Sequence, residues 1–172
     1  MCLALLDRII YSDGSDIQKK QPEFILANYP KVIKPKFKFM YEKIEESFNK
    51  QGLMQTFNAK LALIENGKTE NTCDYSAGLT QQHGFFHAGV MTSIVDSACG
   101  YAALTMMPEN VEVLTVEFKI NFLKPAVTNK LIAIGTVLQS GKTLTVCEGL
   151  VYDGKREKLL SKMTATFIVV QK

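Results

Sequence analysis

The sequence contains no apolar run long enough to span a membrane. Its apolar start, residues 1–6, is interrupted by Asp7 and Arg8 and is too short for a signal peptide. No later segment approaches the roughly eighteen unbroken apolar residues that a membrane helix needs. The 172 residues are 47% hydrophobic and 22% charged, which is ordinary for one soluble globular domain with a core. We therefore expect a soluble cytoplasmic protein.

The cysteines lack the spacing of a zinc site or a disulfide framework. Cys2, Cys73, Cys99 and Cys147 form no CxxC pair. We expect them to be reduced thiols, as in cytoplasmic proteins. Cys99 and Cys147 lie in apolar contexts, where a buried and inert thiol is the common outcome, so neither is expected to be a nucleophile.

An excess of charge of one sign is also missing. Twenty Lys and Arg residues against seventeen Asp and Glu residues leave a formal net charge of +3, and the basic residues form no stripe. Nucleic-acid surfaces require such a stripe or patch. No nucleic-acid partner is expected.

Two Gly-Lys-Thr tripeptides look like the end of a phosphate-binding loop. They occupy residues 67–69 and 141–143, but Ala62 and Thr136 stand where that loop needs its first glycine. Both tripeptides separate strand-like runs, so we interpret them as tight turns.

Histidine occurs only twice, and the pair does not complete a metal motif. His83 and His87 are four residues apart, as on one face of a metal-binding helix. Gly84 takes the place of the expected glutamate, and the sequence shows no third ligand, although zinc needs three or four. We expect neither a metal ion nor an organic cofactor.

The N-terminal part of the chain differs from the rest. Residues 1–36 hold three of the five prolines without a clear hydrophobic period, which predicts an irregular N-terminal extension. An amphipathic helix is predicted from Phe37 to about Gly52 because apolar residues recur at steps of three and four. These residues are Phe37, Met40, Ile44 and Phe48.

The remaining pattern is a long helix between groups of strands. Runs at residues 57–65 and 69–77 flank Asn66 and Gly67, which predicts a hairpin. A second helix is predicted over residues 88–106. Strands follow at residues 116–122, 131–138, 144–152 and 159–169. This order predicts an α+β domain over residues 37–172, in which the long helix lies across one face of an antiparallel sheet.

The long helix carries two kinds of surface. One face is apolar and consists of Met91, Ile94, Val95, Ala98, Tyr101 and Ala102. The other has small side chains around one carboxylate and consists of Gly89, Ser93, Asp96, Gly100 and Ala103. A helical aspartate is usually a solvated surface residue, but small neighbours allow a ligand to approach closely. Asp96 is therefore a candidate catalytic residue.

Three separated segments resemble one family. Residues 81–90, 96–98 and 115–125 are similar to the hotdog-fold acyl-CoA thioesterases of the phenylacetic-acid-degradation (PaaI-like) type. In that family a His-Gly-Gly turn opens the central helix, an Asp follows nine positions after the His, and a later strand ends in Lys, Arg or Ser before Pro. His87 and Asp96 keep this spacing, and Ala88 replaces the first Gly. The resemblance covers about residues 37–169 and implies a six-stranded sheet wrapped around the helix.

The resemblance implies hydrolysis of an acyl or aryl-acyl CoA thioester to the free acid and CoA. The backbone N–H groups of Ala88 and Gly89 would polarise the thioester carbonyl, because the first amides of a helix have no partner within the helix. Asp96 would act as a general base for water or as a nucleophile.

Three further residues receive roles from the resemblance. Gln81 stands where the family has an Asn, and Thr115 stands where it has a Ser or Thr on the next strand. His87 either orients the helix start or donates a hydrogen bond to the thioester. Apolar residues that suit an acyl tail, or equally a core, are Phe85, Phe86, Met91, Met106 and Met107.

The same resemblance implies an assembly with itself. In the family the site lies between two subunits, so a homodimer or a homotetramer built as a dimer of dimers is expected. The motifs of hotdog dehydratases and hydratases do not occur. The departures at Gln81 and Ala88 keep one rival open, a non-catalytic acyl-CoA-binding protein that acts as a sensor or interaction module.

Overall fold

The computed structural model describes residues 35–171. The N-terminal extension predicted for residues 1–36 therefore lies, apart from its last two positions, outside the described residues. Residues Lys36–Lys172 form one compact unit.

The element order agrees with the sequence pattern. The helices are α2 (Pro35–Asn49), α3 (Gly52–Thr56), the 3-10 turn η2 (Ala77–Leu79) and α4 (Ala88–Thr105). The strands are β1 (Lys60–Glu65), β2 (Lys68–Asp74), β3 (Val111–Phe122), β4 (Lys130–Ser140), β5 (Leu144–Asp153) and β6 (Leu159–Gln171). They form one antiparallel sheet in the order β1-β2-β4-β5-β6-β3. The predicted α+β architecture, a six-stranded sheet wrapped around a central helix, is confirmed.

Several features differ from the prediction, since β1 begins at Lys60 rather than at residue 57 and β2 ends at Asp74 rather than at residue 77. Strand β3 begins at Val111 rather than near Val116, because its first residues pair with the end of β6 although they break the alternation of apolar and polar residues. The short helix α3, which has no hydrophobic period of its own, was not predicted.

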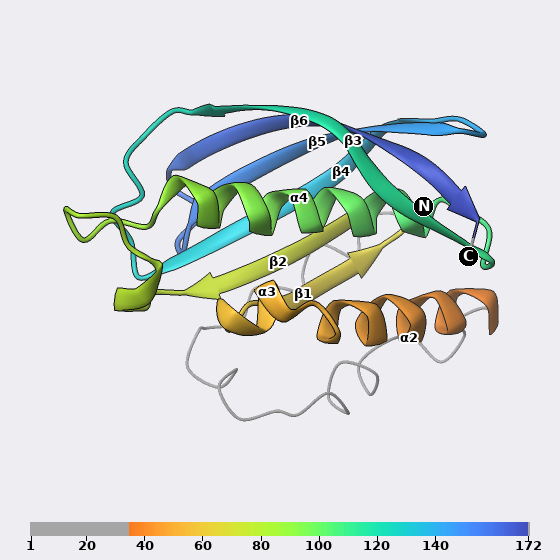
Figure 1. The fold of residues 1–172 in the computed structure, drawn as a ribbon, viewed down its shortest axis with the longest axis horizontal. Coiled ribbons are helices and arrows are strands. Elements are labelled where there is room, and N and C mark those ends of the chain that lie inside the picture. Colours follow the sequence, from red (N-terminus) through yellow and green to blue (C-terminus); the bar gives the residue numbers. More distant parts are fainter. Residues whose placement is uncertain (1–34, 172) are drawn as a thin grey trace, which may run out of the picture. The chain divides into compact units, whose positions relative to one another are not determined.

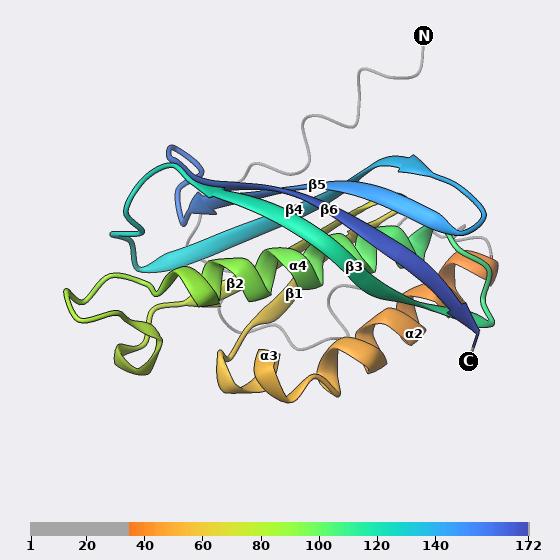
Figure 2. The ribbon, with the colours of Figure 1, turned by 45° about the horizontal axis from the view of Figure 1, so that its top comes forward.

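The curved sheet encloses α4 (Figures 1 and 2). Close packing depends on two glycines of the sheet. A Cβ atom at Gly135 would lie 2.5 Å from the Ala98 backbone, and one at Gly149 would lie 2.5 Å from Val95 Cγ2. The Thr69 hydroxyl also donates a hydrogen bond to the Ala98 carbonyl at 2.6 Å. These contacts hold the helix at a defined depth and rotation against the sheet.

The apolar face predicted for α4 is confirmed, because all six of its residues are buried. The small-residue face is not one continuous surface. Ala103 is fully buried, Gly89 and Ser93 border a hollow near Phe57, and Asp96 lies with Gly100 in a different cavity. The predicted face is divided because neighbouring elements cover α4 along most of its circumference.

Helix α2 packs alongside α4 as an amphipathic helix, with Met40, Ile44 and Phe48 buried. The rings of Phe48 and Tyr101 lie 6.0 Å apart between centroids. The Lys43 ammonium group donates a hydrogen bond to the Val111 carbonyl at 2.6 Å and so connects α2 with the start of β3.

Candidate functional site

Asp96 and Thr115 meet between α4 and β3. The Thr115 hydroxyl donates a hydrogen bond to Asp96 Oδ1 at 3.0 Å. Burial raises the pKa of the Asp96 carboxyl, and the hydrogen bond from Thr115 partly opposes this effect. Thr115 is hydrogen-bonded to Oδ1, and no described residue is hydrogen-bonded to Oδ2, which leaves that oxygen for a reacting group.

A β-bulge brings Thr115 to the face of the sheet that lies against α4. Thr115 pairs with the buried Phe167, and Phe118 pairs with the buried Ala165, so both point toward the helix side. In a regular strand, residues on one face are separated by an even number of positions, but Thr115 and Phe118 are three apart. The reason is that the pairing register shifts between Thr115 and Glu117 and leaves Val116 unpaired. Without the bulge, strict alternation from Phe118 would place Val116 on that face and Thr115 on the opposite one.

His87 is the N-cap of α4. Its Nδ1 accepts a hydrogen bond from the Gly89 N–H at 2.9 Å, and its carbonyl accepts one from the Val90 N–H at 3.0 Å. The Gly89 N–H is therefore committed to the cap, which corrects the expectation that two amides are free. Among the described residues, the Ala88 N–H is the one in this first turn without an acceptor.

The cap also determines where His87 carries its proton. Since Nδ1 is an acceptor, the neutral ring holds its hydrogen on Nε2. Of the two roles considered for His87, the capping role is present in the structure. A hydrogen bond from Nε2 to a thioester stays a prediction.

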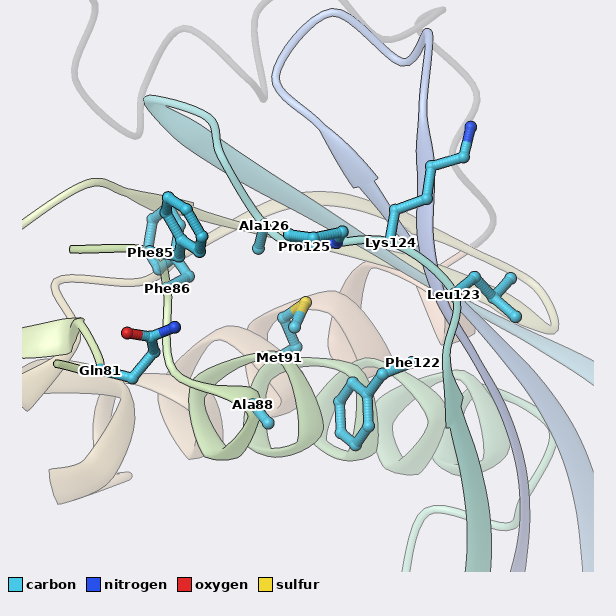
Figure 3. A pocket seen from close by; sticks show the side chains of 10 residues that line it. All are labelled: Gln81, Phe85, Phe86, Ala88, Met91, Phe122, Leu123, Lys124, Pro125 and Ala126. Atoms are coloured by element: carbon cyan, nitrogen blue, oxygen red, sulfur yellow. The ribbon is translucent and has the colours of Figure 1, made fainter. Parts of the chain in front are cut away.

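An apolar pocket of about 420 Å³ lies at the start of α4 (Figure 3). Gln81, Phe85 and Phe86 border it on one side and the segment of residues 122–126 on the other, with Ala88 and Met91 of α4 between them. The Gln81 Oε1 atom accepts a hydrogen bond from the His83 N–H, so its amide nitrogen is left to face the pocket.

Two of the methionines considered for this pocket lie elsewhere. Met106 borders a hollow beside the hairpin turn at Gly67, and Met107 is buried in the core. Sequence reasoning also missed the second side of the pocket, Phe122, Leu123, Lys124, Pro125 and Ala126. The Lys-Pro pair of the resemblance was the one available signal for it.

Asp96 borders a separate cavity of about 170 Å³. This cavity shares no lining residue with the pocket at Ala88. Asp96 follows Ala88 by eight residues, which is about 12 Å of helix rise. One copy of the chain therefore cannot place both groups within about 3 Å of the same carbonyl, the range in which such groups act.

The edge of the sheet next to Asp96 is open. Strand β3 pairs with β6 on one side and with no described strand on the other. Large apolar side chains along this edge are exposed, namely Leu114, Val116, Phe118, Phe122 and Leu123. An unpaired strand with exposed apolar side chains favours association with another chain.

The cysteines offer no alternative nucleophile in the described part of the chain. Cys73, Cys99 and Cys147 are buried free thiols. Burial raises the pKa of Cys73 to about 11 and that of Cys147 to about 12, and it raises the pKa of Cys99 as well. The thiolate, which is the reactive form, is therefore disfavoured at all three positions.

Within residues 35–171 no three His, Cys, Asp or Glu side chains gather as a metal site. The two histidines do not share a helix face, because His83 lies in a turn and His87 caps α4. The helices described by the structure include none that is both long and apolar enough to cross a bilayer.

Residues 83–160 match the sequence model of the thioesterase superfamily. Two proteins of Saccharolobus solfataricus that are provisionally named esterases are similar to the chain. One is 34% identical over 61% of this chain and 75% of its own length. The other is 33% identical over 74% of this chain and 79% of its own length.

Solved structures agree in fold. A thioesterase family protein from Silicibacter pomeroyi has a TM-score of 0.74 and 39% identity, covering 77% of this chain and 99% of its own. The Escherichia coli PaaI protein from the phenylacetic acid degradation operon has a TM-score of 0.71 and covers 77% of this chain and 94% of its own. Its identity of 16% supports the fold alone.

Proposed function

The chain belongs to the thioesterase superfamily, and from this premise we propose that it is an acyl-CoA thioesterase of the PaaI-like type. The proposed reaction converts an acyl or aryl-acyl CoA thioester and water to the free acid and CoA. The observation that carries the proposal is the Asp96 carboxyl, held at 3.0 Å by the Thr115 hydroxyl beside a cavity and an open strand edge. No step of this reaction requires a metal ion or an organic cofactor.

Asp96 is proposed to act through Oδ2. As a general base, it takes a proton from water while the water oxygen bonds to the thioester carbon. The carbon–sulfur bond then breaks, and the CoA thiolate leaves with a proton returned from Asp96. As a nucleophile, Oδ2 itself bonds to the carbon and displaces the thiolate, and water then hydrolyses the mixed anhydride. Both routes need Asp96 ionised at the start.

The carbonyl oxygen is proposed to bind the Ala88 N–H of a second copy. This amide has no acceptor among the described residues and lies at the positive end of the α4 dipole. Because Ala88 and Asp96 of one copy are too far apart, the complete site needs two copies. The side chain of Gln81 borders the same pocket, and its proposed role is to hold the carbonyl or a water molecule.

The open edge of β3 is the proposed contact between the two copies. Pairing of two β3 strands would satisfy the unpaired backbone groups and cover the exposed apolar side chains. It would also bring the start of one α4 toward Asp96 of the other. Such a dimer is isologous, and two of them can associate further into a tetramer.

A panel of acyl-CoA and aryl-acyl-CoA thioesters tests the function. Released thiol is measured with the parental protein and with Asp96→Asn, which keeps the shape of the side chain. Turnover that depends on Asp96 supports the thioesterase. Binding of acyl-CoA without turnover by the parental protein would overturn it in favour of the acyl-CoA-binding module.

A further inference from the structure

The cavity beside Asp96 contains polar groups that the reaction does not use. Its apolar walls are Leu104, Val113 and Phe167. Its volume is about 170 Å³. The cavity therefore has room for the end of a small organic group.

Four side chains form a series of hydrogen bonds in this cavity. The Gln51 amide nitrogen donates to the Tyr101 oxygen at 2.7 Å, and the Tyr101 hydroxyl donates to the Ser47 oxygen at 3.1 Å. Ser97 donates to the Gln51 carbonyl oxygen at 3.4 Å. Ser47, Gln51 and Tyr101 come from α2, the link between α2 and α3, and α4, so tertiary packing brings them together.

These hydrogen-bonded side chains can still bind one more polar group. The Tyr101 oxygen accepts one hydrogen bond and retains a second lone pair, and the hydrogen of Ser47 is not committed to any described residue. Tyr101 is buried, and burial raises the pKa of its phenol, so the hydroxyl keeps its proton. A ligand hydroxyl can therefore donate to Tyr101 and accept from Ser47.

We propose that this cavity holds the far end of the acyl group and that Ser47, Gln51 and Tyr101 select acyl chains with a hydroxyl near that end. This inference rests on the proposed function, because Asp96 must lie at the thioester carbon. A substrate hydroxyl would add two hydrogen bonds, one to the spare lone pair of Tyr101 and one from the Ser47 hydroxyl, which the analogue without the hydroxyl cannot form.

Asp96 and Tyr101 lie on the same helix, and both border this cavity. Tyr101 follows Asp96 by five residues, which is about 7.5 Å of helix rise. An acyl chain whose thioester carbon lies at Asp96 can therefore extend through the cavity toward the Tyr101 and Ser47 oxygens.

The charge of the cavity excludes an acidic end. Asp96 and Glu112 both border it, and Lys43 lies 3.4 Å from the Glu112 carboxylate on the side of α2. A second carboxylate on the acyl chain would be repelled by Asp96, whose ionisation is already disfavoured by burial. The selected end is therefore polar and neutral.

The experiment compares kcat/KM for three thioesters of equal length, namely 6-hydroxyhexanoyl-CoA, hexanoyl-CoA and adipoyl-CoA. With the parental protein we expect the hydroxylated substrate to be the best and the carboxylated one the worst. Tyr101→Phe and Ser47→Ala should each lower the ratio of 6-hydroxyhexanoyl-CoA to hexanoyl-CoA by about tenfold, as for a lost hydrogen bond.

Tyr152→Phe is the matched control. Tyr152 lies on β5 and borders neither cavity, so this variant should keep the parental ratio. If Tyr101→Phe does not fold by circular dichroism, Ser47→Ala decides the question. A parental ratio in the folded variants overturns the cavity as the acyl site and leaves the thioesterase intact. Lack of turnover of every thioester by the parental protein overturns both.

Discussion

Asp96 lies where burial disfavours its ionised form, although the reaction proposed for it requires that form. The raised pKa of the carboxyl has a thermodynamic consequence. Folding penalises the charge at neutral pH, and as the pH falls through the raised value the folded state binds a proton before the unfolded state does, so Asp96 costs less stability at acidic pH. A carboxyl whose charge lowers the stability of the fold is expected at a functional site, where the residue is kept for its chemistry.

Asp96→Asn should therefore separate activity from stability. We expect thiol release to fall by about two orders of magnitude or more. At pH 7 the variant should unfold at the parental temperature or above it, because an amide carries no charge and can still accept the Thr115 hydrogen bond. Calorimetry and the thiol assay measure the two effects, and parental activity would contradict the assignment.

Thr115→Val should move the pH dependence of the reaction. The acid limb of kcat/KM reports ionisation of Asp96 in the free enzyme, and we expect its midpoint above the ordinary Asp pKa of about 3.9. Removal of the Thr115 hydroxyl removes the hydrogen bond that lowers this pKa, so the limb should move to higher pH. Thr115→Ser keeps the donor and serves as the control. A limb that stays in place in the Val variant would exclude Thr115 as the positioning residue.

At the scale of an element, the first helical position of α4 can be tested by substitution of Ala88. Ala88→Pro deletes one N–H at the first helical position, where proline is tolerated. If this amide binds the carbonyl oxygen, turnover should fall by about 10² to 10³, as when one oxyanion donor is removed. Ala88→Gly keeps the N–H and should be close to parental or faster. A folded Pro variant with parental turnover would show that the carbonyl is held elsewhere.

The whole molecule is predicted to be active only as a dimer or a larger assembly. Phe118→Glu places a charge at the open edge of β3 in both copies, so it should yield folded monomers without turnover. Light scattering, circular dichroism and the thiol assay measure the three properties. Leu144→Glu is the matched control, because Leu144 is 47% exposed against 44% for Phe118 but lies at the start of β5. An active Phe118→Glu monomer would contradict the shared site.

Local patterns determined the elements and the main candidate residue. The alternation in the strands, the turn at Asn66 and Gly67 and the helical spacing of apolar residues are short-range properties that neighbouring residues impose on each other. The spacing of His87 and Asp96 likewise belongs to one helix, whose geometry is the same in any fold. The sequence therefore predicted the sheet and the central helix, and it named Asp96 as the candidate catalytic residue, which stays a prediction.

The tertiary structure decided which groups are free and which ones meet. The bulge at Val116 turns Thr115 toward Asp96, so that the two side chains form a hydrogen bond. The ring of His87 accepts the hydrogen bond of the Gly89 amide, which is therefore not free. The cavity of Ser47, Gln51 and Tyr101 joins residues about fifty positions apart, a distance over which no periodicity carries information. Contacts of this kind depend on the depth and rotation of α4 in the sheet, and these are set by packing of the whole domain.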